Sequence, residues 1–282
     1  MRRLLILAGL LCSWRAFGSD FVSFDIGRDH IRLPLFDVSD EDNRRLLNPD
    51  KSVFDYYIPK ATRSQSSLRQ QMTPVRSQGA RGTCSVFAAL GLIEFYDRGN
   101  LSEQCLAKFS SDKDGGWINQ RITWAVNNGL YNESDCQYDK SEGGRNHIPD
   151  LSQANKVWPG GGYTSITQEI SDPIAYIKRK IDDGGPVGIS IYVAGHDWSK
   201  NKIIGVPTDE EIRETCGEDK ANSPDYKKCG GHAVVVTGYN DHEGYLEFKN
   251  SWDWWWGDGG YGKMSYSYYL KMKMGFGKLV SK

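Results

Sequence analysis

Apolar residues in the first half of the chain recur at helical spacing in two places. Residues 84–97 carry one such stripe, and Gly99 follows it as a stop signal. Residues 119–127 carry the second, ahead of the turn that contains Gly129. Residues 101–114 lack this period and are expected to form connecting chain. The first lobe is therefore predicted to be mainly helical.

The period changes in the second half of the chain. One further helix is predicted over residues 172–183, where isoleucines share a face and glycines follow. Beyond it the apolar residues alternate or run continuously, as in β-strands, over residues 186–193, 233–239, 245–249 and 261–266. Residues 194–226 are expected to be irregular, either a surface loop or a specificity element. The fold class is therefore α+β, with an antiparallel, barrel-like sheet in the second lobe.

Composition and charge are those of a globular protein. The 282 residues are 39% hydrophobic and 25% charged, enough for a sizeable core in one domain or two lobes. The formal net charge is −1 and no face is rich in lysine or arginine. We therefore expect no nucleic-acid partner.

The first residues have the features of a secretory signal peptide. The basic start Met1-Arg2-Arg3 precedes an apolar run to Cys12, and Ala16-Phe17-Gly18 offers small residues for cleavage. The run is too short to span a bilayer, and Leu11 disfavours a lipid anchor on Cys12. We expect residues 1–18 to be removed and the protein to be exported, without a membrane anchor, to an extracellular, periplasmic or lysosome-like compartment.

The cysteine count points to one free thiol. Six cysteines less Cys12 leave five, an odd number for an exported protein. If Cys84 is the free one, the other four can pair in three ways. We favour the two local pairs, which are Cys105 with Cys136 and Cys216 with Cys229. Zinc bound by Cys216, Cys229 and His232 is a weaker alternative, because this spacing fits no common zinc motif.

Cys84 is the candidate nucleophile because it lies where an apolar helix begins. Gly79 and Gly82 loosen the backbone before it, and Thr83 is a candidate N-cap. First-turn N–H groups and the helix dipole favour a thiolate at this position. Gln78, together with the Cys84 N–H, would form an oxyanion hole. A buried structural thiol is the alternative if Cys84 is considered alone.

The imidazole and the orienting amide that such a thiolate needs are found downstream. His232 stands at the entry of one predicted strand, and Asn250 at the exit of the next. Paired as a hairpin through residues 240–244, the two strands bring these side chains to the same end of a sheet. The other histidines lack a partner at recognisable spacing and are interpreted as surface or structural residues; they are His30, His147, His196 and His242.

As an ordered set, these motifs resemble those of the papain-like (C1) cysteine peptidases. Residues 73–79 are similar to the run before that family's nucleophile, and residues 101–104 to its next landmark. Family members have their His and Asn about 130 to 150 residues after the Cys, and here His232 lies 148 residues beyond Cys84. The resemblance covers roughly residues 58–282. It implies a papain-like two-lobed fold with the Cys on the helical lobe and the His and Asn on the barrel.

The resemblance also implies a function, that of a secreted cysteine peptidase. Such an enzyme would hydrolyse peptide bonds through a Cys84 thiolate/His232 imidazolium pair and an acyl-enzyme, without metal or cofactor. Gly115 and Gly116 would pair with the backbone of a peptide or protein substrate. Trp252 would shield the His–Asn hydrogen bond and contribute to substrate binding. An acyl-transfer enzyme on the same triad and a non-catalytic binding protein of the same fold are the alternatives.

Residues 19–57 are polar and acidic in patches and precede the expected catalytic domain, residues 58–282. They are interpreted as a propeptide or as an N-terminal extension packed on the domain. We expect this segment to be removed or to lie across the cleft. The expected partners are therefore a peptide or protein substrate and, as inhibitors, the chain's own propeptide or a separate protein, with the enzyme itself a monomer.

The chain departs from the family signature close to the nucleophile. Arg81 stands where the family has a cysteine three residues before the nucleophile, and Ser85 where an aromatic residue follows it. Lys113 stands where the disulfide partner of that cysteine is expected. Both halves of one disulfide are thus absent together, which affects subfamily and specificity more than the chemistry.

Overall fold

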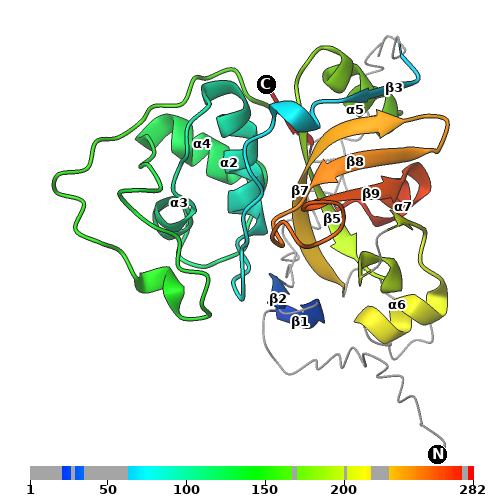
Figure 1. Cartoon of the computed structure of the whole chain (residues 1–282), viewed down its shortest axis with the longest axis horizontal. Helices are drawn as coiled ribbons and strands as arrows, with labels where there is room; N and C mark the ends of the chain where they lie inside the picture. Colours follow the sequence, from blue (N-terminus) through cyan, green and yellow to red (C-terminus); the bar gives the residue numbers. More distant parts are fainter. Residues whose placement is uncertain are drawn as a thin grey trace, which may run out of the picture.

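The structure is a computed structural model with two lobes, one formed by helices and one by a sheet (Figure 1). It describes residues 63–166, 170–199, 202–216, 229–274 and 279–282, and the backbone alone of 21–26 and 29–34. The signal peptide predicted at residues 1–18 lies outside the described residues. The two-lobed α+β fold expected from the sequence is confirmed.

The helical lobe is organised around α2 (Cys84–Asp97), whose residues are buried on nearly every side. It packs against α4 (Ile118–Asn128), α3 (Glu103–Phe109) and the strand β7 (Gly230–Asn240). The two helices expected here are confirmed to within one residue at each end. The expectation of connecting chain over 101–114 was wrong, because α3 lies within it. This helix is short, and Ser102 begins it by accepting a hydrogen bond from the Cys105 N–H at 3.0 Å.

The second lobe is an eight-stranded sheet in the order β4-β10-β5-β7-β8-β9-β6, with β3 also paired to β7. Its strands are antiparallel, except that β6 runs parallel to β9. The bounds of the strands beside β7 are Gln65–Ser67 (β3), Thr164–Ile166 (β4), Val187–Val193 (β5), Ile203–Ile204 (β6), Tyr245–Lys249 (β8), Tyr261–Ser265 (β9) and Leu279–Ser281 (β10). The four strands expected from the sequence correspond to β5, β7, β8 and β9.

Helices accompany this sheet. α5 (Pro173–Asp182) matches its prediction and is capped by the Asp172 carboxylate, which accepts from the Ala175 N–H at 2.9 Å. α7 (Tyr266–Met272) was missed, because it has only seven residues and begins directly after β9, where Ser265 caps it. The region 194–226 was expected to be irregular, yet its described part holds α6 (Asp209–Cys216), β6 and a short 3₁₀ helix, η3 (His196–Ser199). Two further 3₁₀ turns are η1 (Arg69–Gln71) and η2 (Gly144–Asn146).

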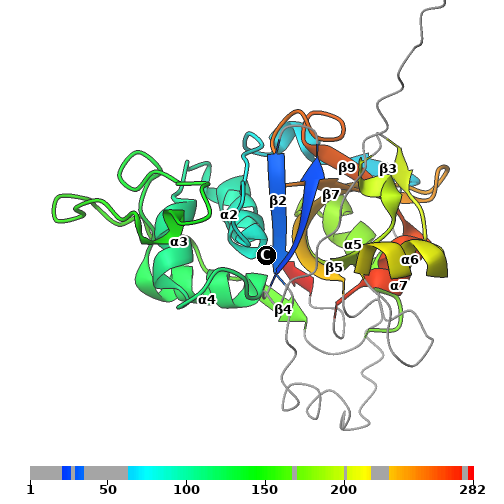
Figure 2. The same ribbon diagram turned by 90° about the horizontal axis from the view of Figure 1, so that it is seen from below.

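A short hairpin near the N-terminus lies between the two lobes. β1 (Phe21–Ile26) pairs with β2 (Asp29–Pro34) in antiparallel register. β2 lies against β7, and Figure 2 shows the hairpin between α2 and the sheet. Both strands belong to the segment 19–57, of which the structure describes these two strands alone.

The junction between the lobes is apolar. One core fills the sheet lobe, and a second gathers residues of α2 and α4 with Ala233 and Val235 of β7 and Val280 of β10. The start of α2 is thus packed directly against the part of β7 that follows His232. Burial of this seam fixes the relative position of the two lobes.

Two disulfides cross-link the chain, and they are the pairs favoured from the sequence. Cys105 is bonded to Cys136, and Cys216 to Cys229. The second bond leaves no thiolate for the zinc alternative, and Cys84 is a free, buried cysteine. In the part of the chain that the structure describes, no helix is long and apolar enough to cross a membrane.

Candidate active site

Cys84 is the first residue of α2 and is 1% exposed. The backbone N–H groups of Ala233, Ser85 and Cys84 itself lie around its sulfur and favour its charged form. The Ala233 contact places the sulfur beside His232, the preceding residue on β7. Thr83 occupies the N-cap position but does not cap the helix, contrary to expectation. Its hydroxyl lies 2.6 Å from the Tyr138 hydroxyl instead.

Burial governs the charge of this thiol. It raises the pKa of Cys84 to about 11, although the three N–H groups and the Arg121 guanidinium act in the opposite direction. Burial therefore favours the neutral thiol over the thiolate at this position. The helix-terminal N–H groups that would stabilise a thiolate are nevertheless in place around it.

His232 and Asn250 meet as the strand pairing predicts. His232 Nε2 lies 2.7 Å from Asn250 Oδ1, which also accepts from the Ser251 N–H at 2.8 Å. Because this oxygen is an acceptor, Nε2 carries the proton and Nδ1 has a free lone pair. Nδ1 is buried and has no hydrogen-bond partner among the described residues. It is therefore the ring atom available to the Cys84 thiol.

Burial favours the neutral form of the imidazole as well. Burial lowers the pKa of His232 to about 4, and the hydrogen bond to Asn250 only partly offsets this effect. The two reactive groups thus lie on adjoining elements, at the start of α2 and on β7, and burial favours the uncharged form of each. The charged pair needs access to water or to another source of polar stabilisation.

Tryptophan rings enclose the histidine. Trp252 stacks on the His232 ring with centroids 4.7 Å apart, and Trp198 meets its edge at 6.1 Å. Trp256 in turn packs on Trp252 at 5.3 Å. Trp252 is fully buried, which supports the expected shielding of the His–Asn hydrogen bond. Its contact with substrate stays a prediction.

Gln78 links the loop before Cys84 to the loop after Asn250. Its Nε2 donates to the Arg81 carbonyl at 2.8 Å, and its Oε1 accepts from the Ser251 hydroxyl at 2.7 Å. The Gln78 N–H also bonds to the Ser251 carbonyl at 2.8 Å. The side-chain amide is thereby held rigidly and is completely buried. This fixed orientation is what an oxyanion-hole donor requires.

Gly115 and Gly116 lie just before α4 with φ of +96° and +104°, a backbone conformation that favours glycine. A Cβ on Gly116 would come within 3.2 Å of Arg121 Nη2. Arg121 also donates to the Gly115 carbonyl. The pair is therefore held in a defined conformation; its pairing with a substrate backbone stays a prediction.

Sequence reasoning missed the buried charged groups around this site. Arg81 has a side chain that is 0% exposed and pairs with Asp114 at 2.9 Å. Between the lobes, Arg76 pairs with Glu94 at 2.6 Å and with Glu103 at 2.8 Å. A charged residue beside a motif was the only signal available in the sequence, and it does not indicate burial.

The other histidines, which were interpreted as surface or structural residues, lie outside the candidate site where the structure describes their side chains. His147 pairs with the Asp139 carboxylate on the surface, and His196 Nε2 lies 2.7 Å from Glu214 Oε2. His242 is exposed and contacts the Ser64 hydroxyl at 3.2 Å. The side chain of His30 lies outside the described residues.

The fold and the site belong together to a recognisable class. The helical lobe presents a cysteine at a helix start, and the sheet opposite presents a paired His and Asn. A family model described as "Papain family cysteine protease" matches residues 59–276. The chain belongs to this family, and the resemblance drawn from the motifs is confirmed.

Curated relatives agree with this assignment. "Digestive cysteine proteinase 2" of Homarus americanus is 30% identical over 222 residues, which is 73% of this chain and 62% of that protein. "Cathepsin J" of Rattus norvegicus is 28% identical over 248 residues, 76% of this chain and 68% of that protein. The chain thus spans about three fifths of the length of the digestive proteinase.

Solved structures share the fold. Xylellain, a cysteine protease from Xylella fastidiosa, superposes with a TM-score of 0.56 at 20% identity, covering 83% of this chain and 89% of that one. Digestive procathepsin L 3 from the larval midgut of Tenebrio molitor gives a TM-score of 0.56 at 22% identity, with coverage of 92% and 82%.

Proposed function

We propose that this protein is a cysteine peptidase in which Cys84 is the nucleophile and His232 the general acid and base. The observation that carries the proposal is the hydrogen bond from His232 Nε2 to Asn250 Oδ1, at 2.7 Å. It leaves Nδ1 for the thiol, whose sulfur lies beside the N–H of the neighbouring residue Ala233. The family assignment supports the same chemistry.

The reaction follows from these positions. The Cys84 thiol gives its proton to His232 Nδ1, and the thiolate attacks the carbonyl carbon of the scissile peptide bond. The oxyanion that forms is stabilised by the Gln78 side-chain amide and the Cys84 N–H. The imidazolium returns its proton to the leaving amine as the C–N bond breaks. Water, deprotonated by His232, then hydrolyses the thioester and releases Cys84.

We further propose that the segment 19–57 covers the site in a latent form of the enzyme and is displaced or removed on activation. The position of β2 against β7, the strand of His232, supports this. So does the burial of both reactive groups, which shifts the pKa of Cys84 to about 11 and that of His232 to about 4, in each case towards the neutral form. Uncovering the site would restore water and move both pKa values back towards the charged pair.

Export to an oxidising compartment belongs to the same proposal. Two disulfides are typical of proteins outside the reducing cytosol. The predicted signal peptide agrees with this location. The enzyme is expected to act as a monomer on peptide or protein substrates.

Intact mass after alkylation tests both parts. Non-reduced protein is treated with iodoacetamide near pH 7, before and after limited proteolysis that removes residues preceding about position 58, and a Cys84→Ala variant is treated in parallel. We expect one adduct on the wild type, faster after trimming, none on the variant, and peptide cleavage that follows the labelling. Labelling without cleavage of any peptide in a mixed library would contradict the peptidase, and equal rates before and after trimming would contradict the cover. Transfer of the acyl group to an added amine, in place of hydrolysis, would indicate the acyl-transfer alternative.

A further inference from the structure

We propose that Arg81 is a positioning residue that ties the loop before Cys84 to the Gly115–Gly116 segment. It takes the place of the disulfide whose two cysteines this chain replaces with Arg81 and Lys113. The inference rests on the proposed function, because it takes Gly115–Gly116 as the segment that binds the substrate backbone. Arg81 itself would not contact the substrate, but its replacement would alter substrate binding.

The guanidinium of Arg81 engages one carboxylate with two parallel hydrogen bonds. Its Nε lies 2.9 Å from Asp114 Oδ2, and its Nη2 lies 3.0 Å from Asp114 Oδ1. The Arg81 side chain is 0% exposed and that of Asp114 is 12% exposed. A two-point contact of this kind fixes orientation as well as distance.

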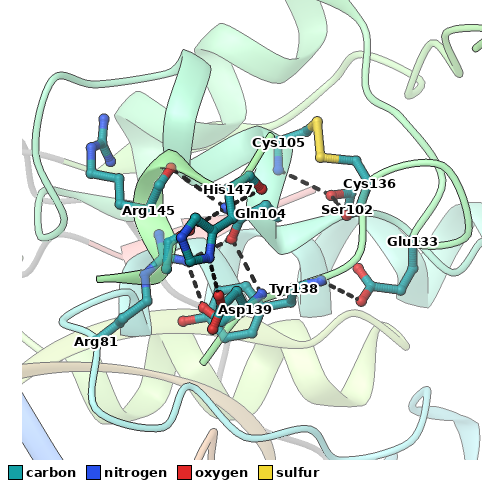
Figure 3. The surroundings of a disulfide bond; sticks show 11 residues. Arg81, Ser102, Gln104, Cys105, Glu133, Cys136, Tyr138, Asp139, Arg145 and His147 are labelled. Atoms are coloured by element: carbon teal, nitrogen blue, oxygen red, sulfur yellow. Dashed lines mark hydrogen bonds and ion pairs between the residues drawn. A yellow bond between two sulfur atoms is a disulfide. The ribbon is translucent and has the colours of Figure 1, made fainter. Parts of the chain in front are cut away.

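The third nitrogen of Arg81 reaches the other side of the same pocket. Nη1 donates to Gln104 Oε1 at 2.6 Å and to the Asp139 carbonyl at 2.9 Å. The guanidinium also lies over the Tyr138 ring, 4.8 Å from its centroid. Figure 3 shows Arg81 pointing into this group, on the side of Gln104 away from the Cys105–Cys136 disulfide. Every nitrogen of the guanidinium therefore has a partner, which is the condition for burying a charge.

Asp114 carries this restraint to the substrate segment, because Gly115 is the next residue. Arg145 holds the same carboxylate from another direction, with Nη1 3.1 Å from Oδ1. Burial alone would raise the pKa of Asp114, but the hydrogen bonds and charges of the two arginines outweigh it and lower the pKa below its usual value. The carboxylate stays charged, and the pairing stays intact, in mildly acidic as well as neutral solution.

Arg81 also contacts the catalytic machinery through its backbone. Its carbonyl accepts the hydrogen bond from Gln78 Nε2 at 2.8 Å, and Cys84 follows three residues later. A single residue thus touches the amide proposed for the oxyanion hole and the carboxylate beside the substrate segment. A disulfide between positions 81 and 113 would join the same two loops, but a reductant would break it.

The test compares three variants of the active protein. Arg81→Lys keeps the charge and loses the two-point contact, while Asp114→Asn keeps the shape and loses the charge. Arg69→Lys is the matched control, because Arg69 also pairs with a carboxylate, Asp258 at 2.6 Å, and lies 4.4 Å from the centroid of the Tyr261 ring. It belongs to neither loop.

The readout is the ratio of two rate constants for labelling Cys84, one for an extended peptidyl epoxide and one for iodoacetamide. Only the epoxide needs the substrate segment, so we expect Arg81→Lys and Asp114→Asn to lower the ratio about 10- to 100-fold, by misplacement of that segment. Arg69→Lys should keep the wild-type ratio. Amide hydrogen exchange at residues 115–117 should quicken in the first two variants and stay unchanged in the third, and it is measurable in the full chain.

A rescue variant separates positioning from general stability. In the double variant Arg81→Cys/Lys113→Cys, with the new bond verified by mass, the ratio should return to the wild-type value. Brief reduction followed by desalting, under conditions in which intact mass shows the Cys105–Cys136 and Cys216–Cys229 bonds to be retained, should lower the ratio again in this variant and leave the wild type unchanged. Recovery of stability without recovery of the ratio would mean that Arg81 has a structural role alone.

The proposal is overturned if both test variants keep the wild-type ratio, or if Arg69→Lys lowers it equally. Because labelling requires no turnover, the proposed peptidase activity can fail while this test still decides the role of Arg81. If the wild type is labelled by neither reagent, the peptidase proposal fails and the exchange rates decide alone. Asp114→Asn carries the comparison if Arg81→Lys does not fold.

Discussion

On the sheet lobe, the imidazole of His232 lies among aromatic rings, whereas on the helical lobe the loop before Cys84 is surrounded by charged and amide groups. Trp252 stacks on His232 at 4.7 Å. Arg81 instead reaches Asp114 through two hydrogen bonds of 2.9 and 3.0 Å. Aromatic packing draws much of its stabilisation from buried area, and the relative orientation of the rings adds to it. A buried ion pair depends on every partner being present, because removing one leaves an uncompensated charge.

The comparison indicates that the two sides fail in different ways. Loss of volume should damage the sheet side, and loss of a single polar atom should damage the helical side. The sides meet at Gln78, whose amide bonds to Arg81 on one side and to Ser251 on the other. Outside the Cys84–His232 pair itself, substitutions at this meeting point should have the largest effect on catalysis.

We expect Gln78→Ala to lower kcat for peptide cleavage about 10²- to 10³-fold, the usual cost of one oxyanion-hole donor. Labelling of Cys84 by iodoacetamide should change little, because that displacement forms no oxyanion. Ser251→Ala is the companion variant: it removes the hydroxyl that holds Gln78 Oε1 at 2.7 Å, and its loss of kcat should be smaller. Steady-state kinetics with a peptide amide, beside the labelling rate, measures both. Equal losses in cleavage and in labelling would contradict the oxyanion role.

On the sheet side, Trp252→Ala should lower the free energy of unfolding by about 3–5 kcal/mol, as expected for removing a buried tryptophan. Trp254→Ala is the control, because this ring lies two residues further along the same loop and is 70% exposed. Its effect should stay within about 0.5 kcal/mol. Urea unfolding followed by circular dichroism gives both values. Trp252→Phe should recover part of the loss by restoring the stack on His232, and equal costs for Trp252→Ala and Trp254→Ala would show that the ring enclosure does not stabilise the lobe.

The same contrast explains what the sequence could predict. α2 and β8 appear at their predicted places, because the spacing of apolar residues along a segment fixes such elements locally. α3 and α7 were missed, because each has seven residues and follows a serine cap rather than a long stripe. The positions of His232 and Asn250 on two strands that are adjacent in the sequence predicted that their side chains come together, since such strands pair.

The Arg81 network could not be predicted from one sequence. Its partners Asp114 and Asp139 lie 33 and 58 residues away, and no local pattern links them. The sequence did show that a cysteine pair was missing at positions 81 and 113. Nothing in the sequence indicated which residues hold the two loops together in place of that disulfide.

An effect that depends on pH is expected at the charged seam between the lobes, where Arg76 pairs with Glu103 and Glu94. Burial raises the pKa of Glu103 to about 8, and nearby Glu94 and Glu133 add to this while Arg76 opposes it. In the unfolded chain a glutamate loses its proton near pH 4.3, so between about pH 4 and 8 the folded protein binds the extra proton. Stability must then fall as the pH rises through that window, by at most about 1.4 kcal/mol per pH unit.

Glu103→Gln removes this proton while its amide oxygen can still accept from Arg76, so the variant should show a flatter dependence of unfolding free energy on pH between about 4 and 8. Glu210→Gln, on the exposed face of α6, is the control and should keep the wild-type slope, since exposed charges contribute little. Urea midpoints at several pH values measure the slope. An unchanged slope in Glu103→Gln would show that the seam holds its carboxylates ionised. The junction of the lobes would then be a fully charged network like that of Arg81, and the contrast between the two sides would not extend to the surface that joins them.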